Sequence, residues 1–258
     1  MDRLIVFIFG SIIGSFLNVC IYRLPKGKSV VTPASSCPKC GTAISWYDNI
    51  PLLSYLILTG KCRSCKAAIS FRYFLVELIT ALLLATIFSV FGLSAKFFAY
   101  SIMSCGLIVA TFVDFEINEI PDEVSMGGLV VGLVLSFAMP SVFGAVSRGG
   151  ALLGSFLGAV AGGASIYIIG FLGELVFKKE AMGGGDVKLM AMIGSFLGWK
   201  LALLVFFVAP LFGSIVGIIL KIKSGRETIP YGPYLSLAAL VAVFFGEKII
   251  RLLFGGLV

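Results

Sequence analysis

Residues 201–220 read LALLVFFVAPLFGSIVGIIL, twenty consecutive residues without a charged side chain. A helix needs about 20 predominantly apolar residues to cross the hydrocarbon core of a bilayer. Further apolar runs lie at 4–22, 73–92, 96–115, 124–140, 150–177, 187–199 and 231–250, of which 187–199 is the shortest. The 258 residues are 59% hydrophobic and 13% charged, which excludes an ordinary soluble domain. We therefore expect an all-α polytopic membrane protein with about eight transmembrane helices.

The basic residues indicate the orientation of these helices. Most of the 20 Lys and Arg residues fall in loops that alternation places on one side, with eight of them in the loop 23–72. The positive-inside rule puts that side in the cytoplasm and both termini outside. The run at 4–22 has no small-residue cleavage site, so we interpret it as a span and not as a removed signal peptide. The net charge of +7 is spread along membrane edges, which favours contact with lipid and excludes nucleic acid as a partner.

Four cysteines stand in the loop as two CxxC pairs, Cys37/Cys40 and Cys62/Cys65, separated by 21 residues. This spacing is typical of a four-thiolate zinc site. Gly41 and Lys66 follow the two pairs closely and suit the tight turns that such a site requires. The alternative is a pair of redox-active dithiols in a membrane thiol oxidoreductase, but a cytoplasmic loop faces a reducing compartment. The sequence predicts structural zinc.

Two carboxylates at the edges of apolar runs are the candidates for catalysis. Asp186 follows three glycines, Gly183–Gly185, and Asp114 lies among apolar residues at the end of the run 96–115. A carboxylate beside lipid is costly and therefore indicates function. Topology places both on the cytoplasmic side, where two close carboxylates share a proton and can activate water and polarise a carbonyl. Asp186 is also expected at a helix start, with Lys188 steering or neutralising it.

The chain contains no histidine, which excludes Ser-His-Asp, Cys-His and HExxH machinery. An aspartate pair is therefore the hydrolytic mechanism that the residues best support. A carboxylate-dependent transporter is the competing interpretation, since intramembrane carboxylates also serve as ion sites. We expect Asp122, directly after Pro121, to cap a helix. Together with Glu116, Glu119 and Glu123, it is also expected to form an acidic rim around Asp114.

Glycines recur at intervals of four, which places them on one helix face. The pairs and triplet are Gly10/Gly14, Gly128/Gly132, Gly154/Gly158/Gly162 and Gly213/Gly217. Such small-xxx-small faces let membrane helices pack closely. The pattern predicts helix packing and no function.

Several motifs together resemble the type IV prepilin peptidases, membrane aspartyl proteases that share a GxGD motif with presenilin-like enzymes. The similarity is carried by Gly14-Ser15-Phe16-Leu17-Asn18-Val19, Arg23-Leu24-Pro25, Cys62–Cys65, Ile69–Tyr73, Val76-Glu77, Asp114, Pro121-Asp122 and Gly183–Leu189. These segments extend over essentially the whole chain.

The resemblance implies a bifunctional enzyme of the bacterial inner membrane. Such enzymes cut the basic leader from prepilins or pseudopilins at the cytoplasmic face. They then methylate the new N-terminal residue, commonly phenylalanine, with S-adenosylmethionine. Asp114 and Asp186 correspond to the catalytic pair, and the four-cysteine loop is associated with the branch that also methylates. No residue of the chain is assigned to the methyl donor.

These expectations divide the chain into three parts. Residues 1–22 form the first transmembrane helix, and 23–72 form a cytoplasmic four-cysteine zinc module. Residues 73–258 form the helical bundle that carries the aspartyl protease site.

Overall fold

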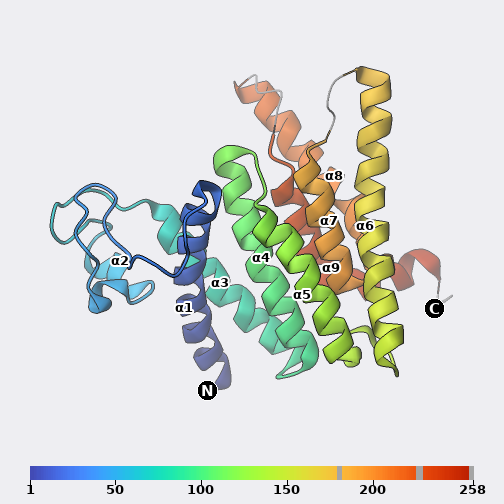
Figure 1. Ribbon diagram of the computed structural model, residues 1–258, viewed down its shortest axis with the longest axis horizontal. Helices are drawn as coiled ribbons and strands as arrows, with labels where there is room; N and C mark the ends of the chain where they lie inside the picture. Colours follow the sequence, from blue (N-terminus) through green and yellow to red (C-terminus); the bar gives the residue numbers. More distant parts are fainter. Residues whose placement is uncertain (179–181, 225–228, 256–258) are drawn as a thin grey trace. The chain divides into compact units, whose positions relative to one another are not determined.

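The computed structural model describes residues 1–178, 182–224 and 229–255, and the regular secondary structure in this part of the chain is helical (Figure 1). Within it, extended pairing is limited to two isolated β-bridges, Ser36↔Ala43 and Lys61↔Ala68. The chain forms two compact units, Met1–Leu93 and Ser94–Val258. The expected all-α class is confirmed.

The first unit is a pair of long helices joined by an extended loop. Helix α1 (Asp2–Arg23) packs against α3 (Phe71–Phe91). Between them lie two 3-10 turns, η1 (Leu24–Lys26) and η2 (Trp46–Asn49), and the short helix α2 (Leu53–Ile57). A side chain at Gly10 would come within 2.8 Å of the Cα atom of Ala81, and one at Gly14 within 2.7 Å of that of Glu77. The expected close packing through glycine is confirmed here, and the helices run antiparallel.

The described residues of the second unit form six long helices and one 3-10 turn. They are α4 (Ala95–Ile117), α5 (Asp122–Ala138), η3 (Pro140–Phe143), α6 (Arg148–Phe177), α7 (Gly184–Leu197), α8 (Trp199–Ser224) and α9 (Gly232–Phe254). Helix α7 packs against each of the other five long helices, and Figure 1 shows it beside α5 and α6.

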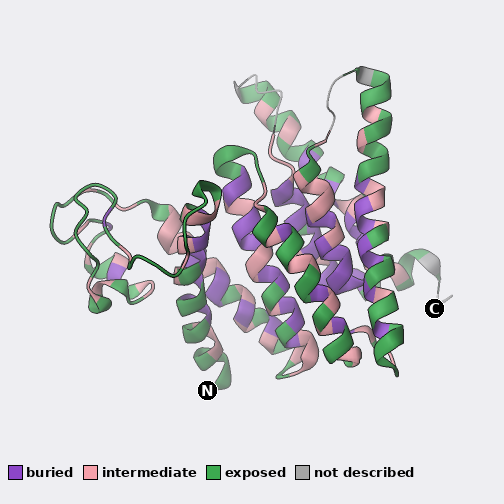
Figure 2. Ribbon diagram, viewed as in Figure 1, coloured by how far each residue is buried: buried purple, intermediate pink, exposed green. Residues whose placement is uncertain are grey.

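Helix α7 is the core of this unit. Its residues Leu189, Met190, Met192 and Ile193 are almost completely buried, and Figure 2 shows much of α7 in the colour of buried residues. A side chain on Gly158 of α6 would collide with the Gly194 carbonyl oxygen and come within 2.7 Å of the Gly198 Cα atom. Two glycine faces therefore bring α6 and α7 into backbone contact, which fixes the start of α7 relative to its neighbours.

Five helices in the described residues are long and apolar enough to cross a membrane. These spans are Asp2–Lys26, Phe71–Phe91, Ala95–Ile117, Arg148–Val176 and Trp199–Lys223. The sequence predicts about eight, and the difference concerns α5, α7 and α9. Helices α5 and α7 have 17 and 14 residues, which is short for a span of about 20 residues.

Candidate functional site

Asp114 lies near the C-terminal end of α4 and is only 4% exposed. Its Oδ2 atom accepts the backbone N–H of Gly232 at 2.8 Å. Gly232 is the first residue of α9, so the unpaired N–H groups and dipole of that helix stabilise the carboxylate. A side chain at Gly232 would itself lie 2.8 Å from Asp114 Oδ2, so only glycine allows the α9 backbone this close.

Asp186 lies in the first turn of α7, outside the five candidate spans. Burial and, to a smaller extent, the negative charge of Asp114 raise the pKa of the Asp186 carboxyl to about 6. The two carboxylates are therefore close enough for the ionisation of one to oppose that of the other. The structure thus brings together the two aspartates that the sequence singled out.

The loop between α4 and α5 fits between the starts of α7 and α9. Side chains built at Gly185 and Gly232 would lie 3.3 Å from Ile120 Cβ and 3.2 Å from Ile120 Cδ1, respectively. Asn118, in the left-handed conformation with φ of 54°, ends α4 and donates its N–H to the Asp114 carbonyl oxygen. The glycines that border both aspartates thus make room for one apolar side chain.

Tyr231, the residue before α9, is a site residue that the sequence analysis missed. Burial, and then the charge of Asp186, raise the pKa of its hydroxyl to about 12. The tyrosine is therefore protonated at neutral pH and can serve as a hydrogen-bond donor beside the acidic pair. The signal in the sequence is the segment Pro230-Tyr231-Gly232-Pro233, which separates two apolar runs.

The structure corrects the roles expected for Asp122 and Lys188. Helix α5 begins at Asp122, but Pro121 occupies the N-cap position and no side-chain cap hydrogen bond forms. Instead, Lys188 Nζ donates to both oxygens of Asp122, at 2.7 and 2.8 Å. Lys188 therefore pairs with Asp122, where the sequence suggested Asp186. This ion pair connects the first turns of α5 and α7.

The four cysteines of the first unit converge on one point. The Sγ atoms of Cys37, Cys40, Cys62 and Cys65 all lie within 4.8 Å of one another, and those of Cys37 and Cys65 are 3.9 Å apart. Four sulfurs arranged around zinc at about 2.3 Å would be separated by about 3.8 Å. The donor set and its size therefore fit a tetrahedral metal ion bound by thiolates.

The two cysteine turns have the same construction, as Gly41 and Lys66 led us to expect. In the first turn, Cys37 donates to the Thr42 carbonyl and accepts from the Gly41 N–H. In the second, Cys62 makes the equivalent bonds with Ala67 and Lys66. Gly41 and Lys66 both adopt positive φ, 72° and 58°. These local turns bring the cysteines of each pair together.

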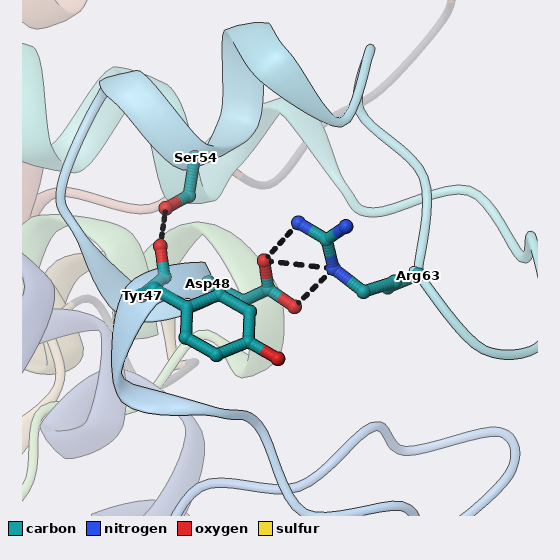
Figure 3. Close-up of polar contacts among 4 residues, drawn as sticks. All are labelled: Tyr47, Asp48, Ser54 and Arg63. Atoms are coloured by element: carbon teal, nitrogen blue, oxygen red, sulfur yellow. Dashed lines mark hydrogen bonds and ion pairs between the residues drawn. The ribbon is translucent and has the colours of Figure 1, made fainter.

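Polar contacts brace the chain between the two turns (Figure 3). Arg63 binds the Asp48 carboxylate through Nε and Nη2 at 2.7 and 2.6 Å, and Ser54 donates to the Tyr47 carbonyl oxygen at 3.0 Å. Arg63 lies inside the second CxxC pair, so this contact ties the intervening segment to the cysteine cluster.

Two family models match the chain in succession. Residues 8–91 match the bacterial peptidase A24 N-terminal domain, and residues 101–218 match the type IV leader peptidase family. A prepilin leader peptidase/N-methyltransferase of Pseudomonas aeruginosa is 37% identical, over 95% of this chain and 90% of its own. The chain belongs to the type IV leader peptidase family.

Other relatives agree with this assignment. Proteins with the same name from Aeromonas salmonicida and Neisseria gonorrhoeae are 35% and 32% identical, over 96% and 95% of this chain and 92% and 91% of their own. No solved structure matches. Asp114 and Asp186 fall within the leader peptidase match, and the four cysteines fall within the N-terminal domain match. Family membership does not favour a thiol oxidoreductase or a transporter.

Proposed function

We propose that this protein cleaves the leader from type IV prepilins or pseudopilins and then methylates the new N-terminal residue with S-adenosylmethionine. The names and coverage of the relatives support the two activities. The single observation that carries the peptidase site is the common surroundings of the two aspartates: Gly232, whose N–H binds Asp114, and Gly185, which precedes Asp186, both lie against Ile120.

In the proposed mechanism the two aspartates share one proton. The ionised carboxylate accepts a proton from water as that water attacks the scissile carbonyl, and the protonated carboxyl donates to the carbonyl oxygen. The proton then passes to the leaving amine, which becomes the new N terminus. The Gly232 N–H orients the Asp114 carboxylate throughout, because it holds Oδ2 at 2.8 Å.

The four cysteines would hold a structural zinc ion, and the closeness of their sulfur atoms supports this proposal. When bound, zinc supplies a rigid tetrahedral crosslink between the two turns. We retain 23–72 as the zinc module, between the first helix 1–22 and the bundle 73–258.

The membrane placement is also part of the proposal. We place the protein in the bacterial inner membrane, with about eight spans and with the cysteine loop and both aspartates on the cytoplasmic side. The bias of Lys and Arg toward that side supports the orientation. The apolar part of a prepilin would then lie in the bilayer with its cleavage point near the cytoplasmic interface.

Cleavage of a purified prepilin in detergent tests the peptidase proposal. Asp114→Asn and Asp186→Asn should each reduce the rate at least about a thousandfold, because each removes one of two cooperating groups. The exposed residue Asp2 provides the matched control, and Asp2→Asn should cleave normally. Cleavage by either catalytic variant at the wild-type rate would rule out the aspartate pair. Mass spectrometry after addition of S-adenosylmethionine tests methylation in the same sample.

A further inference from the structure

The names of the relatives state two activities, leader peptidase and N-methyltransferase, whereas the match to the leader peptidase family lies within the second unit. That match, residues 101–218, includes both aspartates. The first unit, Met1–Leu93, contains neither and matches a separate domain. The first unit is therefore the part of the chain in which groups suited to methyl transfer are expected.

N-methylation of a peptide has a definite chemical requirement. An α-amino group has a pKa of about 8 and is mostly protonated at neutral pH. Only the neutral amine has the lone pair that attacks a methyl group, so a site that binds the predominant ammonium form has to accept its proton. Without any histidine in the chain, a carboxylate is the suitable acceptor.

Residues 1–93 contain three carboxylates, Asp2, Asp48 and Glu77. Asp2 is exposed at the start of α1, and Asp48 is bound by Arg63. Glu77 remains: it lies in α3, inside an apolar candidate span, and is only 8% exposed. A carboxylate in such a helix is costly and indicates function.

A second polar group of the same helix pair has an unused acceptor. Asn18 of α1 is 2% exposed, and its Nδ2 donates to the carbonyl oxygen of Tyr73, one turn before Glu77, at 3.0 Å. Its Oδ1 has no hydrogen-bond partner among the described residues. A buried acceptor without a partner costs about 1–3 kcal/mol. A carboxylate and an amide oxygen together suit a ligand that only donates, such as an ammonium group.

The loop backbone over Glu77 is held in an uncommon conformation. Leu52 has φ of 62° and ψ of −52°, and the Leu53 N–H donates to the Pro51 carbonyl at 2.7 Å. This is a γ-turn with positive φ, which is rare and strained for a non-glycine residue. The Leu52 N–H donates to Glu77 Oε2 at 2.7 Å. The Ser15 side chain of α1 also hydrogen-bonds this carboxylate, so Glu77 is oriented both by α1 and by a loop segment that lies between the two cysteine pairs.

We propose that Glu77 and Asn18 form the site that binds the α-ammonium group of the processed peptide, with Glu77 accepting its proton during methyl transfer. This inference rests on the proposed methyltransferase function. One N–H bond of the ammonium breaks and its proton passes to Glu77. The nitrogen lone pair then forms a bond to the methyl carbon of a sulfonium donor. The carbon–sulfur bond breaks with its electron pair going to sulfur, which gives an N-methylated peptide and a neutral thioether.

Peptide binding without the methyl donor tests the first half of the proposal. The probe is a synthetic apolar peptide that begins with phenylalanine, compared with its N-acetylated form by fluorescence anisotropy. The wild type should prefer the free amine at least about tenfold, because a hydrogen bond to a charged group is lost on acetylation. In Glu77→Gln the preference should disappear, since glutamine still accepts the Leu52 N–H but carries no charge.

Methylation of the same pre-cleaved peptide tests the proton transfer. At pH 7, Glu77→Gln should be about a hundredfold slower than the wild type, as expected for loss of a general base. Raising the pH to 9 should restore about tenfold in the variant, because most α-amine is then unprotonated. The wild type should gain much less over the same pH range, because Glu77 already removes the proton at pH 7; an equal tenfold gain in both proteins would indicate a purely structural role for Glu77.

Thr80→Val is the matched control, because Thr80 is a buried polar residue of α3 whose hydroxyl bonds only to the Val76 carbonyl oxygen of its own helix. It should leave binding and methylation unchanged. Wild-type methylation by Glu77→Gln, or loss of labelled S-adenosylmethionine binding in that variant, would overturn the proposal; the second result would assign Glu77 to the donor. Failure of the wild type to methylate would instead refute the methyltransferase function, and this inference with it.

Discussion

The cysteine cluster and the aspartate pair are assembled in opposite ways. Each half of the cysteine cluster is a six-residue turn closed by its own backbone hydrogen bonds. The aspartate pair instead depends on three helices, and the N–H that orients Asp114 comes from Gly232, 118 residues away. A site built from local turns depends on its ligand for rigidity, whereas a site built from helix ends depends on packing. The following experiments test this contrast, from the largest expected effect to the smallest.

Removing one sulfur should have the largest effect. We expect Cys62→Ser to lose nearly all bound metal and to make the loop between α1 and α3 sensitive to protease, because metal binding supplies the folding free energy of such modules, about 10 kcal/mol or more. Metal analysis and limited proteolysis measure the two effects. Cys20→Ser, which changes a buried cysteine outside the cluster, should keep its metal; metal retention by Cys62→Ser would contradict the four-thiolate site.

A single added methyl group should disrupt the aspartate pair, because this site depends on helix packing. Gly232→Ala would place a carbon 2.8 Å from Asp114 Oδ2, so either the Asp114 carboxylate or α9 must shift, and both shifts disturb the N–H contact that orients the carboxylate. We expect prepilin cleavage to fall about a hundredfold, the effect of a misplacement of about 1 Å. Gly127→Ala is the matched control, since nothing lies within 4 Å of its added carbon. Equal kinetics in the two variants would show that Gly232 does not position Asp114.

Stability should depend on pH with opposite signs in the two regions. Asp186 has a raised pKa of about 6, so its contribution to stability is full below about pH 4 and is lost as pH rises through 6. Asp186→Asn should therefore stabilise the protein at pH 8 by up to about 3 kcal/mol and have little effect at pH 4. Thermal unfolding in detergent at the two pH values measures this.

Arg63 lowers the pKa of Asp48, mainly by hydrogen bonding, so this carboxylate contributes stability above its unfolded pKa that is lost as pH falls. Asp48→Asn should thus destabilise the loop at pH 8. If both asparagine variants shifted stability in the same direction at pH 8, the contrast between the two regions would fail.

The ion pair between α5 and α7 should have the smallest effect. Asp122→Lys or Lys188→Asp alone should slow cleavage a few-fold, because exposed pairs contribute about 1 kcal/mol or less. The double exchange should recover most of the rate by restoring attraction, which a kinetic double-mutant cycle would show. Additive losses would mean that the pair does not hold the start of α7.

The sequence predicted the parts of the fold that depend on local pattern. The all-α class followed from the apolar runs, and the cysteine cluster followed from two CxxC pairs whose geometry depends on Gly41 and Lys66. The spacing of Gly10 and Gly14 also predicted a face for close helix packing, and the structure identifies α3 as the partner.

The remaining features depend on long-range packing that one sequence does not reveal. The sequence predicted that Asp122 caps a helix because Pro121 precedes it. The fold instead brings Lys188 Nζ within 2.7 Å of Asp122 Oδ1, and the two side chains form an ion pair. Tyr231 was missed because nothing local indicates that α9 begins beside Asp114. Asp122, one of the four carboxylates of the expected acidic rim, forms an ion pair with Lys188.

The contact between Gly158 and Gly194 has a consequence for how this chain can vary. Because the backbones of α6 and α7 touch there, any larger residue would displace the helix whose first turn carries Asp186. Such a displacement would reduce the rate of leader cleavage before it prevented the chain from folding. In a deep mutational scan selected for leader cleavage, these two glycines should therefore be nearly as intolerant as the aspartates, although they take part in no chemistry.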